Sequence, residues 1–192
     1  RMVMLGIYMT GRAPFKHVLF HGLVNDPYGK KMSKSKGNVV NPLELVDKYG
    51  ADSVRFALIY GNATGNDQSL SYPKLEAARK FANKIWNMAR FIEMKRSQKS
   101  GNNLTMEQLN NIAKNEKDKE MIEQTKQLIN KVTKYLDSYN FNYAAEALYD
   151  FSWHEFADKY IEKSKAQLKD EAVRANTETI LVHVLSPSLP LL

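Results

Sequence analysis

Cysteine is absent from the 192-residue sequence, and no apolar run is long enough to cross a membrane. Without cysteine, disulfide frameworks and thiolate metal sites are excluded. The four histidines do not stand at a metal-binding spacing such as H-E-x-x-H, and the opening residues lack the pattern of a signal peptide. We therefore expect a cytoplasmic protein with no membrane partner, no metal bound by this chain and enough apolar side chains for a folded core.

Acidic side chains are fewer than basic ones, and the net charge is +7. The excess is spread over both halves of the chain, but residues 30–36 concentrate four lysines. Such a balance fits a polyanionic partner, and a local lysine loop fits a phosphate group. Charge alone leaves open an ordinary basic protein without such a partner. Both ends are apolar and the first residue is not methionine, so we expect further sequence on each side.

The pattern along the first part of the chain predicts two zones. In residues 1–24, the apolar run at 17–22 predicts a short buried strand that ends at a glycine, before a turn and the lysine-rich loop. Residues 38–72 predict short helices with clear end signals. Asn41, Pro42 and Glu44 begin the first helix, and Gly50 ends it in the left-handed conformation. Asp52 is the expected cap of the next helix.

The last zone, residues 73–192, is predicted to be a helical bundle. Its first helix starts near Pro73, and apolar residues at helical spacing continue to Ile92. Residues 97–118 are polar and predict a linker with one weak helix begun by Thr105 and Gln108. Three further amphipathic helices follow, separated by a turn at residues 137–142, and Pro187 is expected to end the last one.

The chemistry is concentrated in residues 29–38. Lysine carries a compact charge on a flexible stem, serine adds a hydroxyl donor, and glycines at both ends let a loop bend. Nucleotidyl transfer needs positive charge placed where negative charge develops, and this composition supplies it. A solvated lysine loop without a ligand is the alternative for such a string taken alone.

The surroundings of the loop favour the chemical interpretation. Residues 31–35 read K-M-S-K-S, followed by G-N-V-V-x-P at 37–42 and Y-G-A-D-x-x-R at 49–55. Through these residues the chain resembles the class I aminoacyl-tRNA synthetases, and the resemblance covers nearly its whole length. It implies a mainly α fold. Residues 1–72 would be the C-terminal remnant of a Rossmann-type α/β catalytic domain with one or two short strands, and residues 73–192 a truncated helical anticodon-binding domain.

Within that family the details resemble the valyl branch. The similarity is carried by H-G-L-V at residues 21–24, by F-x-N-K-x-W-N-x-x-R-F at 81–91, and by the aromatic pattern of residues 141–160. The isoleucyl and leucyl branches are the alternatives. Isoleucyl enzymes usually have an apolar residue at the position of Lys36, and leucyl enzymes usually differ at His21. Methionyl enzymes match the helices poorly.

The resemblance implies roles for the loop residues. Lys34 would contact the ATP phosphates and stabilise the transition state of amino-acid activation, with Lys31 as the auxiliary charge. Ser33 and Ser35 would bond within the loop or to phosphate. Met32 would chiefly pack the loop against the body. His21 would line the adenine pocket or serve a structural role.

Other parts of the family's machinery are not found in this sequence. The second motif, H-x-G-H, is absent. The parent protein would activate valine with ATP, accompanied by Mg²⁺, and transfer it to tRNA(Val). A pocket for valine cannot strongly reject threonine, so such enzymes carry an editing domain, which is also missing here. We expect this chain alone to be inactive and monomeric.

The bundle is expected to contact tRNA. The basic candidates on its first helix and just beyond are Arg79, Lys80, Lys84, Arg90, Lys95, Arg96 and Lys99. A solvated polar face is the alternative for each of them. Trp86, Trp153 and Tyr149 could stack on an anticodon base, but their helical spacing among apolar residues equally predicts core positions.

Three rival interpretations differ in class. The chain could be a tRNA-binding module without catalysis. It could belong to another kind of nucleotidyltransferase, which would leave the match in the helices unexplained. It could also be a structural helical protein with a chance lysine loop.

Overall fold

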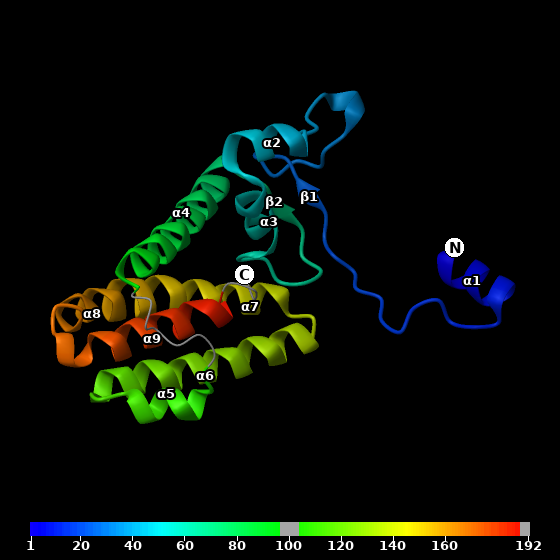
Figure 1. Cartoon of the computed structure of the whole chain (residues 1–192). Coiled ribbons are helices and arrows are strands. Elements are labelled where there is room, and N and C mark those ends of the chain that lie inside the picture. Colours follow the sequence, from blue (N-terminus) through cyan, green and yellow to red (C-terminus); the bar gives the residue numbers. More distant parts are fainter. Residues whose placement is uncertain (97–103, 189–192) are drawn as a thin grey trace.

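The computed structural model describes residues 1–96 and 104–188, and most of them are helical (Figure 1). In the first part the elements are α1 (Met2–Thr10), β1 (Val24–Asn25), the 3₁₀ helix η1 (Lys34–Lys36), α2 (Pro42–Tyr49), α3 (Ala51–Ile59) and β2 (Gln68–Ser69). They are followed by α4 (Tyr72–Lys95), α5 (Met106–Ile112), α6 (Glu116–Asp137), α7 (Phe141–Asp150), the π-helix η2 (Phe151–Ile161), α8 (Glu162–Gln167) and α9 (Glu171–Ser188). The expected mainly α fold with a small α/β remnant is confirmed. Lys99 and the start of the expected linker lie outside the described residues.

The strand expected at residues 17–22 is wrong. Residues 17–21 are exposed and have no regular structure, and β1 begins only at Val24. β1 runs parallel to β2, with Val24 opposite Gln68. A strand forms only where a neighbouring backbone can pair with it, and β2 is two residues long. The ladder therefore ends before it can reach the apolar run.

The helix ends in the middle zone follow the sequence closely, with one exception. The side chain of Asn41 accepts the backbone N–H of Leu43 at 3.0 Å, as expected of an N-cap. Gly50 ends α2 with φ of 87°, a backbone conformation that favours glycine. The expected cap at Asp52 is wrong, because Gly50 itself begins α3 and places Asp52 in the first turn.

Helix α4 connects two separate hydrophobic cores. Near its start, Leu75 and Ala78 pack into a cluster built from α2, α3 and the segment after β2. Near its end, Met88 and Ile92 belong to the larger core of the bundle. Figure 1 shows α4 running from α2 and α3 to the bundle formed by α5 to α9. The expected domain boundary between residues 72 and 73 remains a prediction, since one helix contributes to both cores.

The bundle is held together by apolar packing and by hydrogen bonds of buried polar side chains, among them Asp118. Asp118 of α6 is 2% exposed, and its carboxylate accepts the Tyr160 hydroxyl at 2.9 Å. The expected short helix at Thr105 is confirmed, with a capping box in which Thr105 and Gln108 bond each other's backbone. Helix α9 runs through Pro187 to Ser188, one residue past its expected end, because the φ of proline is itself helical.

The expected third helix is longer and less regular than its pattern predicts. Helices α7, η2 and α8 follow one another without a break from Phe141 to Gln167. The middle part, η2, is a π-helix, a form that is rare and usually short. We call the continuous helical segment Phe141–Gln167 the rod. The turn before it is shorter than the expected 137–142, since helical residues begin at Phe141 and Asn142 is already buried.

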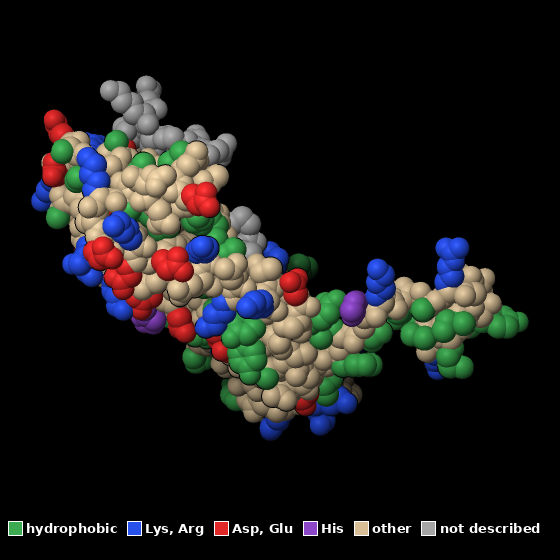
Figure 2. All heavy atoms as spheres, turned by 90° about the horizontal axis from the view of Figure 1, so that it is seen from below, with side chains coloured by type: hydrophobic (Ala, Val, Ile, Leu, Met, Phe, Trp, Pro, Cys, Tyr) green, Lys and Arg blue, Asp and Glu red, His purple; other side chains and the backbone are tan. Residues whose placement is uncertain are grey.

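Helix α1 stands apart from the rest of the described chain. It contains no buried residue, and its apolar side chains are exposed. Figure 2 shows it projecting from the body on the extended segment that precedes β1. Within residues 1–96 and 104–188, no helix combines the length and apolar character needed to cross a membrane.

Candidate functional site

The lysine loop presents its charged residues to solvent on a tight turn. Lys34 and Ser35 lie in η1, and Lys31 comes three residues before it; all three are exposed. The Ser33 and Ser35 hydroxyl oxygens are 2.8 Å apart, so one donates to the other. Gly37 ends η1 with φ of 67° and donates its N–H to the Lys34 carbonyl at 3.2 Å. The turn thus holds Lys34 next to the paired hydroxyls of Ser33 and Ser35, with Lys31 shortly before it in the chain.

The base of this loop is tied together by Asp26 and Asn38. The Asn38 amide donates to the Asp26 carboxylate at 2.9 Å and to the Lys31 carbonyl at 3.2 Å, and it accepts the Ser33 N–H at 2.9 Å. Asp26 also accepts the N–H groups of Tyr28 and Lys30 at 3.0 and 2.8 Å. These hydrogen bonds lower the pKa of Asp26 below its usual value, and the bond from Asn38 has the largest effect.

The sequence interpretation did not include Asp26 among the site residues. Its position at the start of the turn N-D-P-Y-G was a usable signal, because aspartate often bonds the backbone two residues further on. The bond to Asn38 spans twelve residues of chain and had no such signal.

Two other predicted loop residues lie at the edge of the site. Met32 is half-buried, and its Sδ accepts the Val40 N–H at 3.4 Å, which packs the loop against the segment before α2. His21 is exposed, and its Nδ1 donates to the Gly22 carbonyl at 2.7 Å in the tautomer that protonates this nitrogen. A contact between His21 and a nucleotide stays a prediction.

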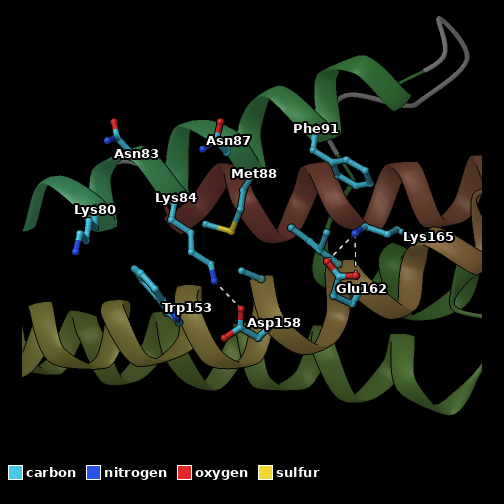
Figure 3. Close-up of a pocket in the computed structure, with 12 residues that line it drawn as sticks. Lys80, Asn83, Lys84, Asn87, Met88, Phe91, Trp153, Asp158, Glu162 and Lys165 are labelled. Carbon is cyan, nitrogen blue, oxygen red and sulfur yellow. Dashed lines mark hydrogen bonds and ion pairs between the residues drawn. The ribbon is translucent and has the colours of Figure 1, made fainter. Parts of the chain in front are cut away.

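A second site is a groove between α4 and the rod of η2 and α8 (Figure 3). Its volume is about 470 Å³, and it includes the predicted Lys80, Lys84 and Trp153. Its other lining residues come from the same helices: Asn83, Asn87, Met88, Phe91, Ala157, Asp158, Ile161, Glu162 and Lys165. Asp158 and Lys165 were not predicted, because nothing in the sequence marks residues from two helices as neighbours.

Charge and aromatic surface meet in this groove. The Lys84 ammonium lies 4.3 Å from the centroid of the Trp153 ring and donates to Asp158 at 2.5 Å. Figure 3 shows Lys84 pointing from α4 toward both. Trp153 also stacks on Tyr149, with ring centroids 5.5 Å apart. A cation over an aromatic face is a stable arrangement that a competing phosphate could rearrange.

The remaining predicted nucleic-acid residues do not line the groove. Arg79, Arg90 and Lys95 are exposed elsewhere on α4, and Arg96 follows the helix with an ion pair to Glu93 at 3.6 Å. Trp86 is 70% exposed, so its interpretation as a core residue is wrong. It lies on a different face of α4 from Phe81, Met88 and Ile92, which are buried.

The aromatic packing of Trp153 reaches the other core. Tyr149 contacts Phe81 and Tyr60, with ring centroids 4.7 and 5.0 Å apart, and Phe56 of α3 stacks on Tyr60 at 5.1 Å. The pKa of Tyr60 is raised, chiefly because the side chain is partly buried and secondly because of the charge of the nearby Tyr149. Trp153 therefore contacts both this aromatic packing and Lys84.

In the described part of the chain, no group of three or more His, Asp or Glu side chains is placed to hold a metal ion. The basic side chains at these two sites are lysines. One site offers lysines and hydroxyls, which suit phosphate, and the other offers lysines beside an aromatic ring, which suits a nucleic acid.

Two protein families match the chain. Residues 1–71 match the tRNA synthetases class I (I, L, M and V), and residues 118–192 match the anticodon-binding domain of tRNA ligase. The first of these matches agrees with the resemblance found in the sequence, and each match covers less than half of the chain.

Over its whole length the chain is similar to valine–tRNA ligases. It is 42% identical to that of Bacillus subtilis strain 168 and 43% identical to that of Clostridium acetobutylicum, in each case over 100% of this chain and 22% of the relative. The chain thus spans about a fifth of the length of these relatives. The resemblance to the valyl branch is confirmed.

Solved structures show the same fold at lower identity. A LeuRS–tRNA–LeuAMS ternary complex of Agrobacterium radiobacter K84 has a TM-score of 0.69 and 23% identity, and covers 99% of this chain and 24% of that one. Methionyl-tRNA synthetase of Mycobacterium tuberculosis in complex with methionyl-adenylate has a TM-score of 0.70 and 22% identity, with coverages of 89% and 34%.

Proposed function

We propose that this chain supplies the ATP-phosphate loop and a tRNA-binding bundle of a valine–tRNA ligase. In that reaction a valine carboxylate oxygen attacks the α-phosphorus of ATP, the bond to the bridging oxygen breaks, and pyrophosphate leaves. The valyl group then passes from the adenylate to tRNA. The observation that carries the proposal is the exposed turn that holds Lys34 beside the Ser33–Ser35 hydroxyl pair, with exposed Lys31 shortly before it in the chain.

The loop's part in this chemistry is electrostatic. Negative charge builds up on the phosphates as the new bond forms, and a lysine ammonium beside them stabilises that state more than the ground state. Lys34 takes this role, with Lys31 as the second charge. The Ser33 and Ser35 hydroxyls bond phosphate or each other. ATP enters with Mg²⁺, which belongs to the substrate complex.

The bundle's part is to bind tRNA, the cognate species being tRNA(Val). The groove residues Lys80 and Lys84 provide phosphate contacts, and Trp153 provides a stacking surface for an unpaired base. Arg79, Arg90, Lys95 and Arg96 extend the basic surface along and beyond α4. The parent protein acts as a monomer in the cytoplasm, where translation takes place.

The test is Lys34→Ala in the full-length polypeptide that carries this chain, assayed by valine-dependent pyrophosphate exchange. The exchange rate constant should fall by about two orders of magnitude or more, while the valine KM changes little, because charge stabilisation by one group is worth roughly that much. Lys163→Ala, an exposed lysine on α8, is the matched control. An unchanged rate in Lys34→Ala would refute the role of the loop, and exchange that depends on isoleucine or leucine instead would assign the neighbouring branch.

A second candidate applies to the 192-residue chain by itself, namely tRNA binding without catalysis. It is favoured by the groove together with the absence of H-x-G-H from this sequence. The purified chain should bind tRNA and show no valine-dependent pyrophosphate exchange. Measured exchange would overturn this second candidate.

A further inference from the structure

A buried carboxylate, that of Asp26, joins the two ends of the lysine loop. Asp26 is 4% exposed, although it lies next to an exposed loop. Its Oδ1 accepts the N–H groups of Tyr28 and Lys30, and its Oδ2 accepts the Asn38 side-chain amide at 2.9 Å. Asp26 precedes the loop and Asn38 follows it, so their hydrogen bond closes the loop at its base.

Asn38 carries this connection onward to the residues of the motif. Its Nδ2 also donates to the Lys31 carbonyl at 3.2 Å, and its Oδ1 accepts the Ser33 N–H at 2.9 Å. The backbone on either side of Met32 is thus fixed by a single side chain. Lys31 is fixed by its own carbonyl, and Lys34 directly follows the fixed Ser33.

Replacing only one of Asp26 and Asn38 by the other residue type leaves the hydrogen bond between them unsatisfied. The Asp26 side chain only accepts, and three donors point at it. Asparagine at position 26 would need its carbonyl oxygen for the Tyr28 and Lys30 N–H groups, which would turn its NH₂ toward the NH₂ of Asn38. Flipping that amide would move the conflict to the backbone N–H groups. The site therefore requires one carboxylate and one amide, facing each other.

We propose that Asp26 and Asn38 are positioning residues for ATP activation, which hold the loop so that Lys31 and Lys34 meet the phosphates. This inference rests on the proposed function. Neither residue needs to touch ATP. They act by restricting a lysine loop that would otherwise sample many arrangements, and small misplacement of a charged group from the reacting phosphates is costly in rate.

The pair offers a reciprocal test. Asp26→Asn places two amides face to face, and Asn38→Asp places two carboxylates face to face. The double variant Asp26→Asn/Asn38→Asp restores one carboxylate and one amide with the roles reversed. In it, position 26 still accepts from Tyr28 and Lys30, and position 38 still accepts the Ser33 N–H. The bond to the Lys31 carbonyl is lost, and this carbonyl then faces a carboxylate oxygen, so we expect partial and not complete recovery.

The experiment measures valine-dependent pyrophosphate exchange in the full-length polypeptide, with kcat and the KM values for ATP and valine determined separately. Each single variant should lower kcat/KM for ATP by about 10- to 100-fold and leave the valine KM unchanged. The double variant should recover at least about tenfold over the worse single variant. Asp47→Asn, the same change at an exposed position on α2, should match the unaltered protein.

A Lys34→Ala background separates positioning from general damage to the fold. If Asp26 acts through the lysines, Asp26→Asn should cause a smaller further loss once Lys34 is gone, because only Lys31 is then left to be positioned. A full multiplicative loss in that background, or a double variant no better than the singles, would overturn the inference. If Lys34→Ala itself leaves exchange unchanged, the proposed function fails instead, so the two failures are distinguishable.

Discussion

The Lys84 ammonium lies 4.3 Å above the centre of the Trp153 ring while it pairs with Asp158. The lysine side chain is 26% exposed and that of Asp158 is 49% exposed, so the pair is accessible to water and to competing anions. A phosphate that replaced Asp158 as the partner of Lys84 would draw the lysine off the ring. The exposed face of Trp153 would then be free for a base.

This arrangement predicts that Lys84 and Trp153 contribute differently to tRNA affinity. Lys84→Gln should weaken binding and reduce the slope of log affinity against log salt concentration by about 1, because one phosphate contact is lost. Trp153→Leu keeps an apolar side chain but removes the stacking surface, and should cost about 1–3 kcal/mol of binding free energy with the slope unchanged. Filter binding of tRNA at several salt concentrations measures both quantities.

Lys126→Gln is the control for this prediction, since Lys126 is an exposed lysine on α6 that does not line the groove. It should leave affinity and slope near those of the unaltered chain. If Lys84→Gln and Lys126→Gln behave alike, the groove is not the RNA-binding surface.

Gly22 is predicted to tolerate no side chain. A Cβ at this position would lie 2.0 Å from the Asn66 carbonyl oxygen and 2.5 Å from the Asp67 nitrogen, both backbone atoms. Gly22→Ala should therefore push the two segments apart and break the bond from the Leu23 N–H to the Asp67 carboxylate, which is 2.7 Å long. We expect a cost of about 1–3 kcal/mol, as for other overpacked sites.

Hydrogen exchange at Gln68 and Leu70 reports this loss, because their amides donate to the Leu23 and Asn25 carbonyls across the β1–β2 ladder. Leu23→Ala alters an exposed neighbour and should leave both amides protected. Equal protection in Gly22→Ala and the unaltered chain would contradict the close packing.

The sequence was informative wherever a signal is local. The caps at Asn41 and Thr105 and the K-M-S-K-S turn each depend on residues within a few positions of one another. It failed where the outcome depends on what lies across space. The apolar run at residues 17–22 resembles a strand, but only a partner backbone can make it one, and the outward orientation of Trp86 depends on where α4 meets the bundle.

The functional sites divide in the same way. Lys31 and Lys34 were identified from the motif alone, whereas the Asp26–Asn38 contact and the pairing of Lys84 with Asp158 join residues from separate segments. Asp158 lies in η2, and no periodicity in the sequence predicts a π-helix there. Without that helix's geometry, the groove lining could not be assembled from the sequence.

The two cores joined by α4 are predicted to respond separately to substitution. Leu75 is fully buried in the first core, and Met88 is 5% exposed in the second. Leu75→Ala and Met88→Ala should each cost about 2–5 kcal/mol. Hydrogen exchange should rise in α2 and α3 for Leu75→Ala, and in η2 and α9 for Met88→Ala. The same pattern from both variants would mean that the chain unfolds as one unit and that a boundary at residue 72 has no energetic meaning.

Tyr160 is predicted to make the bundle less stable in alkaline solution. Its hydroxyl is buried and donates to the Asp118 carboxylate. The pKa of Tyr160 lies far above its usual value, chiefly because of burial and secondly because of the negative charge of Asp118. Above about pH 10 the unfolded chain releases this proton while the folded chain keeps it, so unfolding becomes more favourable. The loss of stability from this residue should approach about 1.4 kcal/mol for each further pH unit.

Tyr160→Phe removes the ionising group and isolates its effect. Near pH 9 this variant should be less stable than the unaltered chain by about 1–3 kcal/mol, because Asp118 loses a donor in a buried site. Near pH 11 the difference in the free energy of unfolding should shrink. Only the unaltered chain has a tyrosine at position 160 whose ionisation favours the unfolded state. Tyr8→Phe, at a tyrosine that is 89% exposed on α1, is the control and should leave the free energy of unfolding unchanged at both values. Urea unfolding followed by circular dichroism measures these differences. An equal gap between the Tyr160→Phe variant and the unaltered chain at both pH values would show that folding does not raise the pKa of Tyr160.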